Sequence, residues 1–181
     1  MNECLKCICY LAAAGVLSFV IGRILPAKWF SYDKFPYCMW KWEKNGNLYR
    51  RLGVHKWKDK FPDMSVVLPR IIPSKRLPKD MDISGVARMV QETCIAELIH
   101  CLLCFVGLGC IFIWKGLGGI CISGLYVLGN LTYCVIQRYN RPKLVKILKN
   151  LKAREIHKER MKQEEVYEEC SDFKLQHRAG A

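Results

Sequence analysis

The chain has 181 residues, of which 51% are hydrophobic and 25% are charged, and its formal net charge is +13. The apolar residues gather in three long stretches, with the basic residues between and after them. This segregation excludes an ordinary soluble globule, in which apolar residues recur every few positions. The high apolar content also excludes a disordered chain, because such chains bury too little apolar surface to fold.

The basic residues are concentrated in two segments. Of the 29 lysines and arginines, 14 lie in residues 26–92 and 12 in residues 138–181. A strongly basic chain commonly binds nucleic acid or the anionic face of a membrane, and the long apolar stretches favour the membrane. We therefore predict membrane lipids as partners, and no nucleic acid.

Residues 1–25 predict a first transmembrane helix. Residues 7–22 contain no charge, and the apolar run reaches residue 25 if Arg23 extends back toward the lipid headgroups. That length suffices, because about 20 helical residues cross a hydrocarbon core of about 30 Å. A cleaved signal peptide is the alternative, but the run ends without a small-x-small cleavage pattern.

Residues 26–92 predict a basic aromatic layer at the membrane interface. The segment contains four of the five tryptophans, interleaved with lysines. Amphipathic rings and ammonium groups together are typical of the headgroup region. Six prolines divide the segment, so we expect no helix longer than about four turns before residue 80.

Residues 93–137 predict a transmembrane helical hairpin. Its two apolar arms are separated by little more than Lys115 and neighbouring glycines. So short a connection makes the arms antiparallel neighbours. We expect Gly124 and Gly129 to leave room for close approach of the two backbones. The predicted fold class is therefore all-α, an integral membrane protein with about three transmembrane helices, one single span plus this hairpin.

Residues 138–181 predict a basic, then charged, cytoplasmic tail. Beyond Pro142 the apolar residues have helical spacing, with lysines over much of the remaining circumference. Either an amphipathic helix on the inner leaflet or a simple extension of the third span fits this pattern. Residues 154–169 are charged nearly all round and predict a solvated helix.

The basic residues also predict the topology. Lysine and arginine favour the cytoplasmic side, which places the segment 26–92 and the C-terminus in the cytoplasm. The N-terminus and the turn at Lys115 are then outside.

The eleven cysteines do not indicate a disulfide scaffold, because eight of them lie inside the apolar stretches, where cysteine behaves as a small hydrophobe. Two Cys-x-x-Cys pairs occur, at residues 4–7 and 101–104, and neither has a second half at zinc-finger spacing. We predict no metal and no cofactor.

Glu97 and His100 are the two ionisable groups placed in an otherwise apolar span. A charge at the centre of such a helix costs about 2.5–3.5 kcal/mol on insertion scales, so these residues are functional candidates. The Glu-x-x-His spacing puts both on one helical face. A histidine oriented by a carboxylate is a suitable general base for acyl transfer. Glu97 could equally lie at the interface, with His100 bonded to a neighbouring helix.

Two further polar groups are candidate substrate-binding sites. Lys58, Asp59 and Asp63 lie in a basic stretch that fits either a headgroup site or an interfacial helix with its own salt bridges. His55 precedes Asp59 by four residues, one fewer than in the His-x4-Asp motif of glycerolipid acyltransferases.

Arg138, Asn140 and Arg141 end the third span at the cytoplasmic boundary. These arginines either anchor the helix or bind the phosphate or sugar of a lipid substrate.

Several short motifs occur in one order along the chain. They are Phe-Pro-Tyr at 35–37, Trp-Glu at 42–43, Tyr-Arg-Arg-Leu-Gly-Val at 49–54, Trp-Lys-Asp at 57–59, Pro-Asp at 62–63, Glu-Thr at 92–93, Ala-Glu-Leu-Ile-His at 96–100 and Gln-Arg-Tyr-Asn-Arg-Pro at 137–142. In this order they resemble the glycosyl-4,4'-diaponeurosporenoate acyltransferase family of bacterial membrane proteins, over about residues 26–150.

The resemblance implies transfer of a fatty acyl group to a hydroxyl, in the named case on the sugar of a glycosylated carotenoid, at the bacterial cell membrane. Acyl-CoA, acyl carrier protein and phospholipid are the candidate donors. Glu97 and His100 match the family's Ala-Glu-x-x-His stretch, and Arg138, Asn140 and Arg141 match its arginine-rich stretch. The family pattern tolerates arginine or lysine at His55, which favours the aspartates of that segment as site residues.

Two alternatives belong to other classes of function. A non-catalytic scaffold of a lipid-synthesis complex would act through the basic aromatic layer, and a small membrane methyltransferase would also suit a helical hairpin with an arginine-rich boundary. The sequence shows no serine or cysteine paired with a base, which favours direct transfer over an acyl-enzyme.

Overall fold

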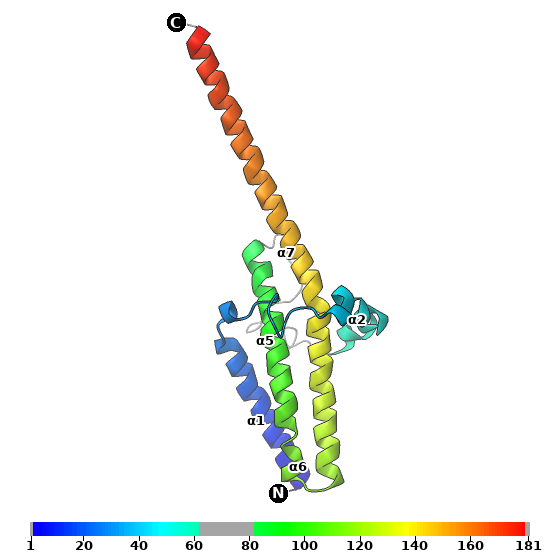
Figure 1. Ribbon diagram of the computed structural model, residues 1–181. Helices are drawn as coiled ribbons and strands as arrows, with labels where there is room; N and C mark the ends of the chain where they lie inside the picture. Colours follow the sequence, from blue (N-terminus) through cyan, green and yellow to red (C-terminus); the bar gives the residue numbers. More distant parts are fainter. Residues whose placement is uncertain (1, 62–81, 180–181) are drawn as a thin grey trace.

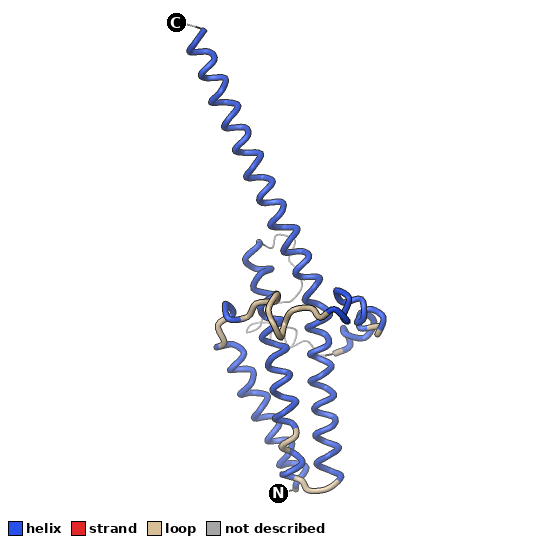
Figure 2. Tube along the Cα trace, in the orientation of Figure 1, coloured by secondary structure: helices blue, strands red, loops and turns tan. Residues whose placement is uncertain are grey.

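The computed structural model describes residues 2–61 and 82–179, and within these ranges every regular element is helical (Figures 1 and 2). Three helices are long and apolar enough to cross a membrane. They confirm the prediction of an all-α membrane protein with one separate span and a hairpin. The elements, in chain order, are α1 (Glu3–Ile24), η1 (Ala27–Trp29), η2 (Lys41–Gly46), α2 (Asn47–Arg51), α3 (Val54–Trp57), η3 (Lys58–Lys60), α5 (Ile83–Gly107), α6 (Cys110–Ile113) and α7 (Leu117–Ala179).

The start of each of the first two long helices is fixed by a side-chain cap. The Asn2 side chain accepts a hydrogen bond from the Cys4 N–H before α1, and the Asp82 carboxylate accepts one from the Gly85 N–H before α5. Such caps satisfy N–H groups that have no partner within the helix. α5 therefore begins ten residues before the predicted start of the hairpin at residue 93.

The hairpin is formed by α5, the short helix α6 and α7, with the turn between Trp114 and Leu117. Gly116 lies in this turn with φ +101°, a conformation that glycine adopts without steric cost. α5 and α7 run side by side, and α1 lies against α5 (Figure 1). Toward the opposite end, Val86 and Val90 of α5 pack against Leu148 of α7.

α7 is one continuous helix that passes through Pro142 and extends well beyond the bundle (Figure 1). Of the two predicted arrangements after Pro142, the structure has the helical extension of the third span. Residues 152–167 of this extension are exposed, as expected for a helix charged nearly all round.

Gly107 and Gly109 allow side chains to approach the helix backbone closely, whereas the sequence pointed to Gly124 and Gly129. A Cβ atom at Gly124 or Gly129 would meet nothing within 4 Å, so the expected role of these two residues is wrong. At Gly107 a Cβ atom would lie 2.5 Å from Cδ1 of Tyr126, and at Gly109 it would lie 2.6 Å from the Tyr10 hydroxyl. The close approach is therefore of aromatic side chains to the helix backbone.

The segment after α1 crosses the hairpin before it forms a small lobe. Phe30 packs against Cys94 and Ile95 of α5, and Figure 2 shows the following loop running across α5 and α7. We call η2, α2, α3 and η3 the helical lobe. It packs on α7 through a cluster of Tyr49, Val54 and Tyr139. All described helices in residues 26–61 are shorter than two turns of α-helix, which agrees with the prediction for this part of the layer.

Candidate functional site

Four charged side chains meet where the crossing loop lies against α5 and α7. They are Glu43 from η2, Glu97 from α5, and Arg138 and Arg141 from α7, and we call them the charge network. Arg138 and Arg141 are three positions apart on α7 and therefore lie on one face of that helix. Three separate parts of the sequence are thus joined at one place.

The Glu97 carboxylate is bound by both arginines. Its Oε1 accepts a hydrogen bond from Nη1 of Arg138 at 2.7 Å, and its Oε2 accepts one from Nη2 of Arg141 at 2.5 Å. Charge-assisted hydrogen bonds of this kind are shorter and stronger than neutral ones. The sequence analysis gave Glu97 the role of orienting His100, but the structure engages both of its carboxylate oxygens with α7.

Glu43 is fully buried and completes the network from the lobe side. Its carboxylate accepts two hydrogen bonds from Arg138, one from the Tyr49 hydroxyl and one from the Trp40 N–H. Burial raises the pKa of Glu43, but these hydrogen bonds outweigh it and hold the pKa below its ordinary value. Burial and the neighbouring carboxylate raise the pKa of Tyr49, so its hydroxyl remains a donor.

The remaining N–H groups of the two arginines bind the crossing loop and α5. Arg138 donates to the carbonyl oxygens of Pro36 and Cys38, and Arg141 donates to that of Tyr37 at 2.8 Å. Arg141 also donates to the hydroxyl and the carbonyl oxygen of Thr93. The donors that the sequence analysis assigned to a lipid headgroup are therefore used within the protein.

The network is balanced in charge and shielded from solvent. Two carboxylates face two guanidinium groups, and the side chains of Glu43 and Arg141 are at most 1% exposed, those of Glu97 and Arg138 at most 13%. Buried charges are tolerated when they are paired and fully hydrogen-bonded, and removal of one partner leaves an uncompensated charge. The network therefore anchors the crossing loop to the hairpin.

His100 lies one helical turn from Glu97 along α5, on the side away from the cytoplasmic end predicted for the hairpin. Its Nδ1 is 2.9 Å from Oδ1 of Asn130 on α7. Its ring stacks on the Tyr133 ring, with centroids 4.8 Å apart and planes within 9°. The imidazole is partly exposed, whereas Asn130 is buried. His100 is thus held between the two arms of the hairpin.

The lobe reaches this histidine through aromatic contacts. Phe61 meets the Tyr133 ring edge-on at 6.0 Å between centroids, and Trp57 meets Phe61 at 5.6 Å. The rings of Trp57, Phe61, Tyr133 and His100 therefore form a continuous row from the lobe to α5. This row brings residues 57–61 of the basic aromatic layer next to His100.

The other predicted site residues lie apart from the network. Lys58 donates to the exposed Asp59 carboxylate at 2.6 Å, which is the local salt bridge that the sequence allowed as an alternative. Asn140 is partly exposed on α7 and makes none of the hydrogen bonds that hold Glu97. Asp63 lies outside the described residues.

The sequence reasoning missed Glu43 and Asn130. Glu43 stands in the Trp-Glu motif at 42–43, which was noted only as part of a pattern. Asn130 is a polar residue in the third span, and a buried amide in an apolar helix was a signal that could have been used.

The ten cysteines between Cys4 and Cys134 are free thiols. Cys101 of α5 and Cys134 of α7 lie in contact, with their sulfur atoms 3.6 Å apart. Within the described ranges no group of three or more histidine, cysteine, aspartate or glutamate side chains could hold a metal ion.

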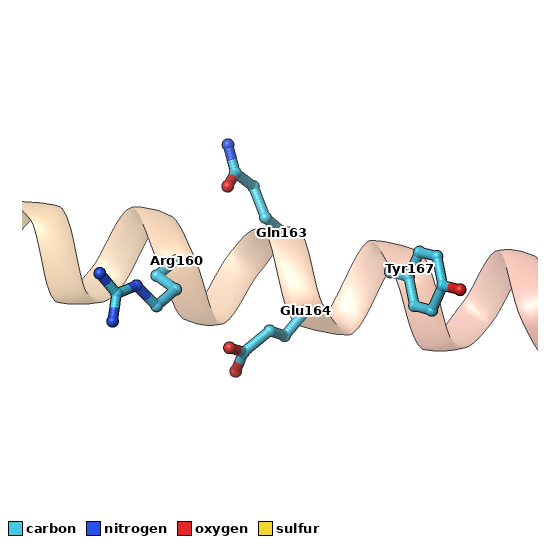
Figure 3. Close-up of a pocket in the computed structure, with 4 residues that line it drawn as sticks. All are labelled: Arg160, Gln163, Glu164 and Tyr167. Carbon is cyan, nitrogen blue, oxygen red and sulfur yellow. The ribbon is translucent and has the colours of Figure 1, made fainter.

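A surface hollow on α7 has no features of a ligand site. Arg160, Gln163, Glu164 and Tyr167 line it, all from the exposed end of this one helix (Figure 3). The four side chains extend from the helix in different directions, and no other helix faces them in this view.

Comparisons with known proteins agree with the resemblance. A family model described as glycosyl-4,4'-diaponeurosporenoate acyltransferase matches residues 26–150. A protein of that name from Staphylococcus aureus strain MRSA252 is 31% identical over 137 residues, which cover 74% of this chain and 81% of the relative. The relatives from the bovine strain RF122 / ET3-1 and from strain N315 are 30% and 28% identical over the same shares. No solved structure matches.

The matched residues include the whole charge network, His100, Asn130 and the helical lobe. The match thus covers the parts of the chain that form the site, and it excludes α1 and most of the exposed end of α7. The chain belongs to the glycosyl-4,4'-diaponeurosporenoate acyltransferase family, a family of acyltransferases.

Proposed function

We propose that the protein transfers a fatty acyl group to a hydroxyl of a glycolipid within the membrane. The acceptor named for its relatives, a glycosyl-4,4'-diaponeurosporenoate, is the one we propose for this chain. Family membership supports the reaction, and the three apolar helices support a lipid acceptor. The single observation that carries the assignment of the site is a partly exposed imidazole in a transmembrane hairpin, beside a buried charge network.

His100 is the general base in this proposal. Its imidazole takes the proton of the acceptor hydroxyl while the hydroxyl oxygen attacks the acyl carbonyl carbon. A C–O bond forms, the bond from the carbonyl carbon to the donor's leaving group breaks, and the imidazolium returns the proton to that thiolate or alkoxide. The step needs no oxidant or metal, and histidine is the side chain that most often serves as a general base near neutral pH.

The charge network positions the site instead of binding substrate. Its arginine donors are committed to carboxylates and to carbonyl oxygens of the crossing loop. The lobe that follows this loop places Phe61 on Tyr133, and Tyr133 on His100. We therefore propose that Glu97, Arg138 and Arg141 act on catalysis only by holding these parts together, and that Lys58, Asp59, Asp63 and Asn140 contribute to headgroup binding.

The orientation in the membrane follows from the basic residues. The positive-inside rule puts the lobe and the end of α7 in the cytoplasm and the turn at Lys115 outside. The charge network then lies near the inner boundary of the bilayer, with His100 one turn deeper. Acyl-CoA, acyl carrier protein and phospholipid all carry a fatty acyl group as a thioester or an ester, so each is a candidate donor.

The test is an acyl-transfer assay on membranes containing His100→Ala. Labelled acyl-CoA, acyl carrier protein and phospholipid are supplied separately with a glycolipid acceptor, and the acylated product is measured by mass spectrometry. We expect at least a hundredfold loss of turnover, as is typical when a general base is removed. The matched control is His55→Ala, because His55 is an exposed histidine of the lobe.

Full turnover by His100→Ala would refute the assignment of the base. Absence of acyl transfer by the unsubstituted protein with every donor, together with methyl incorporation from a methyl-donor nucleotide, would favour the methyltransferase alternative. A scaffold predicts a different result again, in which pigment or glycolipid synthesis in cells survives His100→Ala.

A further inference from the structure

We infer that Asn130 is the positioning residue of His100 and fixes the tautomer in which Nε2 is the basic nitrogen. The inference rests on the proposed function for its consequence in catalysis, but its structural part can be tested separately. The sequence analysis gave this role to Glu97, whose carboxylate is bound by two arginines.

The orientation of the Asn130 amide is set by its own helix. Its Nδ2 donates to the carbonyl oxygen of Tyr126, one turn earlier on α7, at 2.9 Å. A flipped amide would place Oδ1 against that carbonyl oxygen, and two acceptors would then face each other. The oxygen end of the amide is therefore the end that points to His100.

This orientation determines which nitrogen of the imidazole carries the proton. An amide oxygen only accepts hydrogen bonds, so Nδ1 of His100, 2.9 Å from Oδ1, must be the donor. In the neutral ring the lone pair is then on Nε2, which is the nitrogen that can take a proton. A buried amide in an apolar span is costly unless both of its ends are paired, and here both are.

Tyr133 restricts the plane of the ring. It lies three residues after Asn130 on α7, on the same face, and stacks on the imidazole. The hydrogen bond sets the rotation of the ring in its plane, and the stacking sets the plane. Two side chains of one helical turn therefore define the direction of the basic nitrogen, which is the kind of preorganisation that acid–base catalysis needs.

The decisive measurement is nitrogen-15 NMR of the purified full-length protein with ring-labelled histidine. The signals of His100 are identified by their loss in His100→Ala, and their shifts distinguish an Nδ1–H ring from an Nε2–H ring. We expect the Nδ1–H form in the unsubstituted protein. In Asn130→Leu, which keeps the approximate shape and removes the acceptor, we expect the Nε2–H form to become the major neutral species.

Kinetics give the second readout. We expect Asn130→Leu to lower kcat by about tenfold to a hundredfold with KM changed less than twofold, because the base is misoriented and the binding surface is kept. Asn130→Asp retains an acceptor oxygen and should keep the Nδ1–H form and more of the activity. The matched control is Thr132→Val, whose hydroxyl also bonds its own helix, at the Leu128 carbonyl oxygen.

The outcomes separate the two proposals. An Nδ1–H ring in Asn130→Leu, with kcat unchanged, would overturn the positioning role even if His100→Ala is inactive. Activity of His100→Ala would instead overturn the proposed function, while the NMR result would still decide whether Asn130 sets the tautomer. If Asn130→Leu does not fold, a loss of the Nδ1–H form in Asn130→Ala supports the inference and its retention contradicts it.

Discussion

Glu43 and Arg138 lie 95 positions apart in the sequence, and the carboxylate accepts two hydrogen bonds from the guanidinium group, from Nε at 2.6 Å and from Nη2 at 2.8 Å. This bidentate pair joins the helical lobe to the third span. Because Arg138 also binds Glu97 of α5, one side chain connects three parts of the chain. The arrangement of the site depends on this connection.

Glu97→Gln should destabilise the protein strongly. The substitution leaves two buried guanidinium groups with one carboxylate, and breaking a buried pair typically costs about 3–5 kcal/mol. The measurement is thermal and denaturant unfolding in detergent, followed by tryptophan fluorescence. Glu92→Gln is the control, because Glu92 pairs with Arg88 at the surface and should change the free energy of unfolding by less than about 0.5 kcal/mol. Equal effects of the two substitutions would contradict a structural role of the network.

Stability should decrease in acid through Glu43. Its pKa in the folded protein lies below the ordinary value of 4.5, so folding favours the carboxylate. The resulting stabilisation is fully present above pH 4.5 and is lost as the pH falls through the lower folded pKa. Unfolding temperatures measured between pH 7 and pH 3 should show this loss. Glu43→Gln should have a lower unfolding temperature at neutral pH, and that temperature should vary less between pH 7 and pH 3. If it varied with pH as much as in the unsubstituted protein, Glu43 would not be the cause of the acid sensitivity.

Gly107→Ala and Gly124→Ala should have opposite effects. A methyl group at Gly107 would lie 2.5 Å from the Tyr126 ring, and such overpacking typically costs about 1–3 kcal/mol. At Gly124 the methyl group meets nothing within 4 Å, and alanine is favoured over glycine in a helix by up to about 1 kcal/mol. Unfolding in detergent distinguishes the two. If Gly124→Ala lowered the free energy of unfolding more than Gly107→Ala, Gly124 would have to pack against a neighbouring helix, which contradicts the structure described here.

The topology predicts that the turn at Lys115 is outside and the end of α7 inside. Alkaline phosphatase inserted at residue 115 should be active in cells, since the enzyme matures only outside the cytoplasm. A green fluorescent protein fused after the last residue should fluoresce, since it folds only in the cytoplasm in such fusions. The reverse pair of results would contradict the orientation given by the basic residues.

Much of the fold follows from the sequence because lipid permits few solutions. An apolar run of about 20 residues must satisfy its own backbone, and in lipid it does so as a helix. The same reasoning singled out Glu97 and His100, whose polar side chains are costly there. The helix α5 begins ten residues before the predicted span, because the less apolar residues 83–92 continue it and the Asp82 side chain caps its start.

The partners of these side chains could not be read from the sequence, because they depend on the register between helices. Which residue of α7 faces His100 is set by the length and shape of the turn at Gly116, and the spans are apolar nearly all round, so no polar face shows the packed side. For the same reason Gly124 and Gly129 were chosen by composition and proved to be on open faces. Glu43 could not be recognised as a site residue, because it lies in a segment where charged residues are common.

α7 carries Asn130, Tyr133 and both network arginines, and it continues without a break past the bundle. From Arg141 to Tyr167 it spans about 39 Å at 1.5 Å per residue. The exposed end of α7 and the turn that carries Asn130 and Tyr133 are therefore parts of one uninterrupted helix, with the buried ion pairs of Arg138 and Arg141 between them.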